Sequence, residues 1–196
     1  MSALSAEFED LFDGRPDDLE GRAGDLGRTA EAIASAALAL QDLVRQQQSR
    51  STDAAGTASS EAAAGLQRAQ DRYQGTSTAL VTYAVELGDI QREARVAIEE
   101  GDAHLGQIPL REAEIHDLEN ALTLAIAKGE STSTIEDRLG EARVALSTAM
   151  GAAEDARQAL NSARRRLWDA ADRAGDQIST AIEEGADSFG DNWNQF

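Results

Sequence analysis

Apolar residues recur along this 196-residue chain in steps of three and four, the spacing that places side chains on one face of an α-helix. The first such stripe follows Pro16, a residue that suits the first position of a helix. Its members are Leu19, Ala23, Leu26, Ala30, Ile33, Ala37, Leu40 and Val44. The spacing therefore predicts a first long helix that packs against another helix at a shallow angle.

A second helix is predicted from about Ala62 to His104, after a polar passage at residues 46–65 that indicates a loop or a weak helix end. Its seam has two rows with seven-residue spacing: Tyr73, Leu80, Leu87 and Ala94, and then Tyr83, Ile90 and Ala97. Both tyrosines of the chain thus fall on the seam, where the ring buries a large area and the hydroxyl reaches the rim. Gly75 is expected either to let a neighbouring backbone come close or to break the helix.

Two further helices are predicted toward the C-terminus. Pro109 opens a short one that ends at Gly129, the expected glycine after the helix end. Ser133 and Glu136 form a capping-box pattern for the last helix, which at about 50 residues is about 75 Å long. This last helix has the clearest seam, with the rows Ile135, Ala142, Ala149, Ala156, Ala163, Ala170 and Leu139, Leu146, Ala153, Leu160, Leu167, Ala174, Ala181.

These elements predict an all-α fold: an elongated antiparallel bundle of long helices, arranged as two helical hairpins, with a very long C-terminal helix. The domain organisation expected is an N-terminal segment at 1–16, an elongated helical domain at 17–188 and an aromatic tail at 189–196. Aromatic residues are only 4% of the chain, which suits thin interfaces between helices. The residues expected to form the packing seam or to bind a partner are Tyr73, Leu80, Tyr83, Leu87, Ile90, Leu160, Leu167 and Trp168.

The charge of the chain excludes several classes of partner. A net charge of -18 disfavours nucleic acid, whose phosphates require a cationic face, and it disfavours anionic membrane surfaces.

No apolar run approaches the roughly 20 residues of a membrane span. The N-terminus shows no basic stretch followed by an apolar one, so no secretory signal peptide is visible. The absence of cysteine excludes disulfides and thiolate metal sites.

Catalytic and metal-binding patterns are weak. His104 and His116 follow Glu100 and Glu112 by four residues, whereas di-iron bundles use a Glu-x-x-His spacing. No serine lies in a G-x-S-x-G context. The arginines at 164–166 are expected to form a solvated face that pairs with acids of a neighbouring helix. We therefore expect no enzyme activity, no cofactor and no metal.

Most aromatic residues lie at the two ends of the chain. Phe8 and Phe12 are near the N-terminus, and Phe189, Trp193 and Phe196 are near the C-terminus. One interpretation is that both ends fold back and close one end of the bundle. The other is that the C-terminal aromatic residues are a docking tail or the start of a further domain.

Three segments carry a resemblance to a known family: "DGRPDDLEGRAGDLGRTAEAI", "RYQGTSTALVTYAVELGDIQREARVAIEEGDA" and "ARRRLWDAADRAGDQISTAIEEGADSFGDNW". With them the chain resembles the N-terminal helical region of actinobacterial type VII secretion substrates, relatives of the WxG and LxG proteins. Neither tryptophan is followed by glycine two positions later, and neither tyrosine by an acidic residue four positions later. The resemblance therefore implies that the export signal lies partly on a partner protein.

The resemblance implies a non-catalytic targeting and partner-binding module, cytoplasmic before export and then secreted through the type VII route. Its partner would be a small helical chaperone or the secretion machinery. Two alternatives stay open: a structural coiled-coil scaffold that forms a homo-oligomer, and an acidic immunity-type protein that binds a basic toxin. The sequence leaves open the identity of the partner and of any toxin domain after residue 196.

Overall fold

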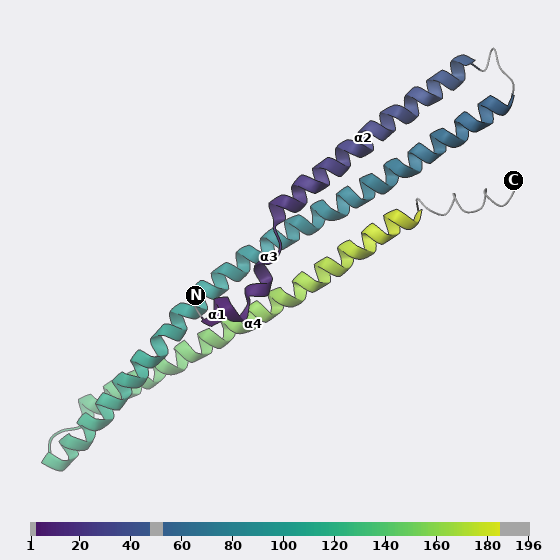
Figure 1. The fold of residues 1–196 in the computed structure, drawn as a ribbon. Coiled ribbons are helices and arrows are strands. Elements are labelled where there is room, and N and C mark those ends of the chain that lie inside the picture. Colours follow the sequence, from purple (N-terminus) through teal and green to yellow (C-terminus); the bar gives the residue numbers. More distant parts are fainter. Residues whose placement is uncertain (1–2, 48–52, 185–196) are drawn as a thin grey trace. The chain divides into compact units, whose positions relative to one another are not determined.

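The computed structural model describes residues 3–47 and 53–184, and the regular elements in these ranges are helices (Figure 1). They are α1 (Ala3–Glu7), the 3-10 helix η1 (Glu9–Phe12), α2 (Pro16–Gln47), α3 (Asp53–Lys128) and α4 (Ser133–Glu184). The predicted all-α fold of long packed helices is confirmed. The predicted very long C-terminal helix is α4, with 52 residues.

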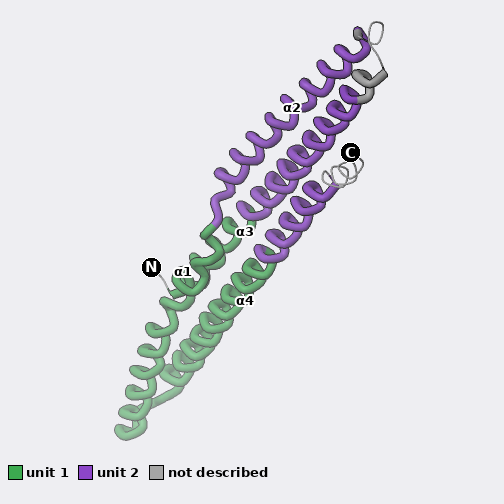
Figure 2. The backbone as a smooth tube through the Cα atoms, turned by 45° about the vertical axis from the view of Figure 1, so that its right-hand side comes forward, with its two compact units in different colours: residues 1–13, 89–166 green, residues 14–88, 167–196 purple. Residues whose placement is uncertain are grey.

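The described residues form two compact units, and both α3 and α4 are divided between them (Figure 2). Unit 1 takes its residues from 1–13 and 89–166, and unit 2 from 14–88 and 167–196. Unit 1 contains the hairpin of α3 and α4, and unit 2 contains the antiparallel pair of α2 and α3. The two hairpins therefore share α3.

The second and third helices expected from the sequence are a single helix of 76 residues, with Pro109 in its interior. The prediction that Pro109 opens a new helix is wrong. A proline inside a helix leaves the carbonyl of residue i−4 without its hydrogen bond, here that of Leu105. Pro109 lies on the exposed side of α3, where water can hydrate this carbonyl, and both flanks of the helix remain packed on α4. This packing outweighs the local cost of the proline.

The polar passage at 46–65 is also more helical than predicted, because α2 runs to Gln47 and α3 begins at Asp53. Alanine has the highest helix propensity, and it recurs throughout the first turns of α3. Alanine content therefore outweighed the glycines and serines that indicated a loop.

The turn between α3 and α4 confirms the predicted role of Gly129. Its φ angle is 72°, in the left-handed region that glycine adopts without strain. The N–H of Glu130 donates to the carbonyl of Ala125 at 3.0 Å, and the N–H of Gly129 donates to that of Ile126 at 3.1 Å, which is the Schellman pattern. The helix α4 starts one residue earlier than the capping box predicted, because the carbonyl of Thr132 accepts from the N–H groups of Ile135 and Glu136.

The core of unit 2 consists largely of small side chains. On α2 the buried residues of the predicted stripe are Ala23, Ala30 and Ala37. The hydroxyl of Ser77 on α3 donates to the carbonyl of Ala23 at 2.8 Å in a buried position. A Cβ atom added to Gly75 would lie 2.8 Å from the Cβ of Ala181 on α4, so the expected close approach at Gly75 is confirmed.

The core of unit 1 follows the two predicted rows of α4, and its buried members there are Leu139, Ala142, Ala149, Ala153, Ala156, Leu160 and Ala163. Leu118 of α3 packs with Leu139 and Ala142 near the turn. The N-terminal residues Leu4, Phe8 and Leu11 are completely buried in the same unit. The N-terminal end of the chain therefore folds back on the helices, whereas Phe189, Trp193 and Phe196 lie outside the described residues.

Candidate functional site

The predicted seam residues separate into three groups by burial. Leu87, Ile90 and Leu160 are buried, and Leu80, Tyr83 and Leu167 are half-buried. These six side chains pack within the chain itself, so they stabilise its own helices. A site for another protein must therefore be sought among side chains that these helices leave exposed.

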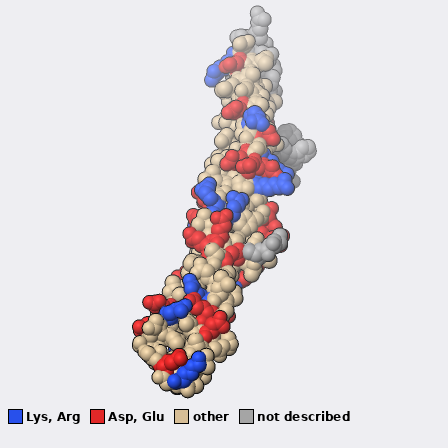
Figure 3. Space-filling model, turned by 90° about the vertical axis from the view of Figure 1, so that its left-hand side faces the viewer, with Lys and Arg blue, Asp and Glu red and all other residues tan. Residues whose placement is uncertain are grey.

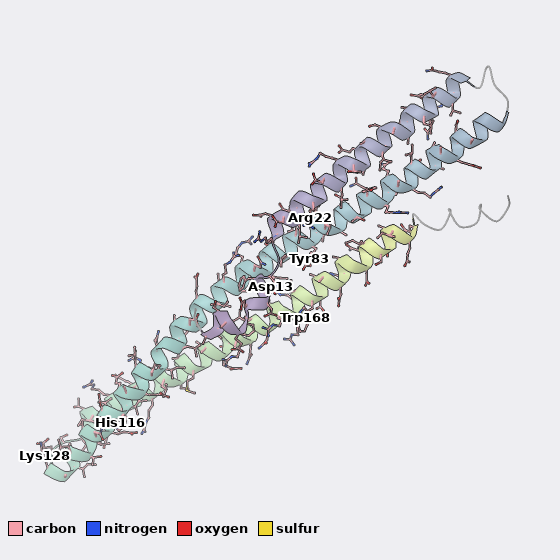
Figure 4. All side chains as sticks on the ribbon, viewed as in Figure 1. Asp13, Arg22, Tyr83, His116, Lys128 and Trp168 are labelled. Carbon is pink, nitrogen blue, oxygen red and sulfur yellow. The ribbon has the colours of Figure 1, made fainter. Side chains whose placement is uncertain are left out.

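Trp168 is the seam residue that the structure corrects. Its side chain is 60% exposed, and Figure 4 labels it on α4. The buried seam residue Ala170 lies two positions later, about 200° around the helix, so Trp168 faces away from the packed side. Tyr73 is also more exposed than expected, at 37%.

A second row of apolar residues, which the sequence reasoning missed, lies on α3 within unit 1. Its members Val96, Leu110 and Leu124 are spaced by 14 residues and are 50%, 68% and 56% exposed. At the intermediate seven-residue positions, Ala103 is small and exposed, and Asp117 interrupts the apolar row with an exposed carboxylate. Each lies two positions after a buried or half-buried residue of α3, such as Gly101, which meets Ala156 of α4, and therefore about 200° around the helix from it. We call Val96, Ala103, Leu110 and Leu124 the outer row of α3.

The surroundings of the outer row are acidic. Between residues 96 and 124 the chain has seven Asp and Glu residues and one basic residue, Arg111. Arg111 itself is paired with Glu114 at 2.8 Å. On the face shown in Figure 3, acidic and basic side chains are interspersed with uncharged ones. An exposed apolar row with acidic flanks suits the helix of a partner that has apolar and basic positions.

Unit 2 has a groove of about 580 Å³ between α3 and α4. Gly75 and Ala181, whose backbones approach closely, are among its lining residues. The other residues that line it are Arg68, Asp71, Gln74, Thr78, Ala79, Thr82, Asp176, Gln177, Thr180 and Glu184. Thr78 and Thr82 donate their hydroxyls to carbonyls of their own helix, at 2.9 and 3.0 Å, so these groups are already engaged. The groove is lined by charged and polar side chains, and they do not form a pair of nucleophile and base.

Two of the three arginines at 164–166 pair with acids of neighbouring elements, as the sequence predicted. Arg166 pairs with Glu93 of α3. Arg164 binds residues 3–12 at the N-terminus. Its Nε and Nη2 atoms donate hydrogen bonds to the two carboxylate oxygens of Asp10, at 2.7 and 2.6 Å. Hydrogen bonding to Asp10 raises the pKa of the Arg164 guanidinium above its ordinary value, against the opposing effect of burial.

The two histidines do not form part of a metal site in the described residues, where no group of three or more His, Asp or Glu side chains is arranged to hold an ion. His116 is exposed on α3 (Figure 4). Across residues 3–47 and 53–184, no helix combines the length and the apolar character needed to cross a bilayer.

Comparisons with known proteins give no relative for this chain: no family model matches it, and neither does a curated protein or a solved structure.

Proposed function

We propose that this chain is a non-catalytic, helical targeting and partner-binding module of a type VII secretion substrate. The outer row of α3 is the observation that carries the partner-binding part of the proposal. The three segments that resemble type VII substrates carry the targeting part. The partner is a small helical chaperone or a helical element of the secretion machinery.

The outer row has the chemistry that a helix-in-groove or coiled-coil contact needs. Residues spaced by seven along a helix meet the same face of a second helix. Covering a leucine side chain such as Leu110 or Leu124 contributes about 1.5–3 kcal/mol. The acidic flanks repel acidic partners and favour a helix with Lys or Arg beside its apolar stripe.

The same charge argues against the scaffold alternative, in which this row would join copies of the chain. Two chains of net charge -18 repel each other, most strongly at low ionic strength. A homo-oligomer would also place acidic flanks against acidic flanks. A basic helical partner removes this repulsion.

Co-purification of the chain with a small WxG-type helical protein tests the partner-binding part. Leu110→Lys should weaken this complex at least tenfold, because it places a charge in the middle of the outer row. Val144→Lys is the matched control: Val144 is equally exposed, at 67%, but lies on α4. Both variants should keep the helical circular dichroism of the natural chain.

Export tests the targeting part. The tagged chain should accumulate in the medium of an actinobacterial host with an active type VII system, and stay inside cells whose secretion ATPase is inactivated. Export without that ATPase, or a stable homo-trimer in light scattering, would contradict the proposal. Tight binding to a basic toxin without export would support the immunity alternative instead.

A further inference from the structure

The N-terminal residues 3–12 lie on a surface of unit 1 formed by α3 and α4, which we call the N-terminal site. Its members are Arg95, Gly101, Ala156, Arg157 and Arg164. The Cδ1 atom of Leu4 lies 2.5 Å from where a Cβ atom of Gly101 would be, so Leu4 fills space that only glycine leaves open. Phe8 is completely buried, with the Cζ atom of Arg164 4.5 Å from its ring centroid.

The side of this contact that α3 and α4 contribute is basic, whereas the chain as a whole is acidic. Glu7 pairs with Arg157 at 3.3 Å, and Asp10 pairs with Arg164. Arg164 also donates to the backbone carbonyl of Glu7 at 2.9 Å. Arg95 lies over the ring of Phe12, with its Cζ atom 5.6 Å from the ring centroid. On a chain of net charge -18, three arginines therefore select an acidic segment that also has aromatic residues.

The helices within residues 3–12 are too short to be stable by themselves. The helix α1 has five residues and η1 has four, far below the roughly 12–15 residues at which an isolated helix becomes marginally stable. The conformation of this segment is therefore imposed by the N-terminal site. Detaching the segment exposes the buried side chains of Leu4, Phe8 and Leu11 but leaves the backbone hydrogen bonds of α3 and α4 intact. The free energy of detaching it is therefore smaller than the free energy of unfolding these helices.

We propose that the N-terminal site is an exchangeable peptide-binding site for an acidic amphipathic segment of a partner protein, which residues 3–12 occupy until they are displaced. The segment that fits has large apolar residues at positions i, i+4 and i+7, as Leu4, Phe8 and Leu11 do. It has carboxylates at i+3 and i+6, as Glu7 and Asp10 do. This site is separate from the outer row of α3, and its argument does not depend on the type VII proposal.

The test uses a fluorescein-labelled peptide of residues 3–13 as the probe and fluorescence anisotropy as the measurement. The full chain with Glu7→Gln and Asp10→Asn keeps the site but holds its own segment less tightly. The probe should bind this chain at least tenfold more tightly than it binds the natural chain, since the internal competitor is weaker. Adding Arg164→Ala to the same chain should weaken the probe at least tenfold.

A second chain with Phe8→Ala weakens the internal segment by a different route and should also bind the probe more tightly. The probe with Phe8→Ala serves as the control and should not bind any of these chains. Equal affinity for the natural and weakened chains, with their helical circular dichroism intact, would overturn the proposal. A concentration-dependent dimer that Phe8→Ala abolishes would also overturn it, because it would assign the site to a second copy of this chain.

Discussion

Gly101 of α3 and Ala156 of α4 meet so closely that a Cβ atom added to Gly101 would lie 2.8 Å from the Cβ of Ala156. Gly75 and Ala181 have the same relationship in unit 2, also at 2.8 Å. The Cβ of alanine cannot move away by changing a rotamer, so a side chain at either glycine would have to push the two helices apart. In each unit a glycine opposite an alanine thus sets the spacing of α3 and α4.

Gly101→Ala should therefore destabilise the chain, although alanine is the better helix former. The propensity gain of about 1 kcal/mol is outweighed by overpacking, which costs about 1–3 kcal/mol. Gly106→Ala is the control, since nothing lies within 4 Å of the added Cβ, and it should raise the free energy of unfolding. Urea unfolding followed by circular dichroism distinguishes them. Equal stabilisation by the two changes would show that the close approach at Gly101 is absent.

Ser77→Ala should lower the free energy of unfolding by about 1 kcal/mol, because it removes a buried hydrogen bond between α2 and α3. Ser35 donates to its own helix at the exposed carbonyl of Glu31, at 2.9 Å. Ser35→Ala should be neutral or slightly stabilising for this reason. The same urea series measures both, and an equal effect of the two changes would argue against the α2–α3 contact.

Arg164→Ala should detach the N-terminal segment and lower the free energy of unfolding by about 1–2 kcal/mol, since the partly exposed pair with Asp10 and the contact with Phe8 are both lost. The control is Arg165→Ala, at an exposed position of the same helix. Amide hydrogen exchange should be accelerated in residues 3–12 of the first variant. Unchanged exchange there would contradict the role of Arg164.

The contribution of Arg164 to stability should not depend on pH between about pH 6 and pH 9. Asp10 raises the pKa of Arg164 in the folded chain above its ordinary value, so the stabilisation is fully present below the ordinary value and is lost only as pH rises through the raised pKa. The difference in the free energy of unfolding between the natural chain and Arg164→Ala, measured across this range, checks the sign. A steady decline within it would point to another titrating group.

Leu87→Glu should cost about 3–5 kcal/mol and unfold unit 2, because it buries a charge without a partner at a completely buried position. Tyr83→Glu should cost less, since Tyr83 is half-buried and a carboxylate there can reach water. His116→Ala and Glu112→Ala, at exposed positions, should change the free energy of unfolding by less than about 0.5 kcal/mol. A loss of stability in either of the last two variants as large as that of Leu87→Glu would contradict the packing of α3 described above.

The sequence by itself determined the features that depend on neighbouring residues. The alanine and leucine rows of α4 follow from periodicity, the start of α2 from Pro16, and the turn at Gly129 from the freedom of glycine at positive φ. These features are local because helical spacing and backbone sterics act within a few residues. The all-α class followed from them directly.

The tertiary structure alone decided which faces are covered. Pro109 stays within a helix because both of its flanks pack on α4, and Trp168 is exposed because it lies opposite the packed side. Arg164 and Asp10 lie 154 residues apart in the chain, and Phe8 is buried by helices that no local pattern links to it. Periodicity gives a helix its faces, but contacts between residues far apart in the sequence choose which of those faces a neighbour covers.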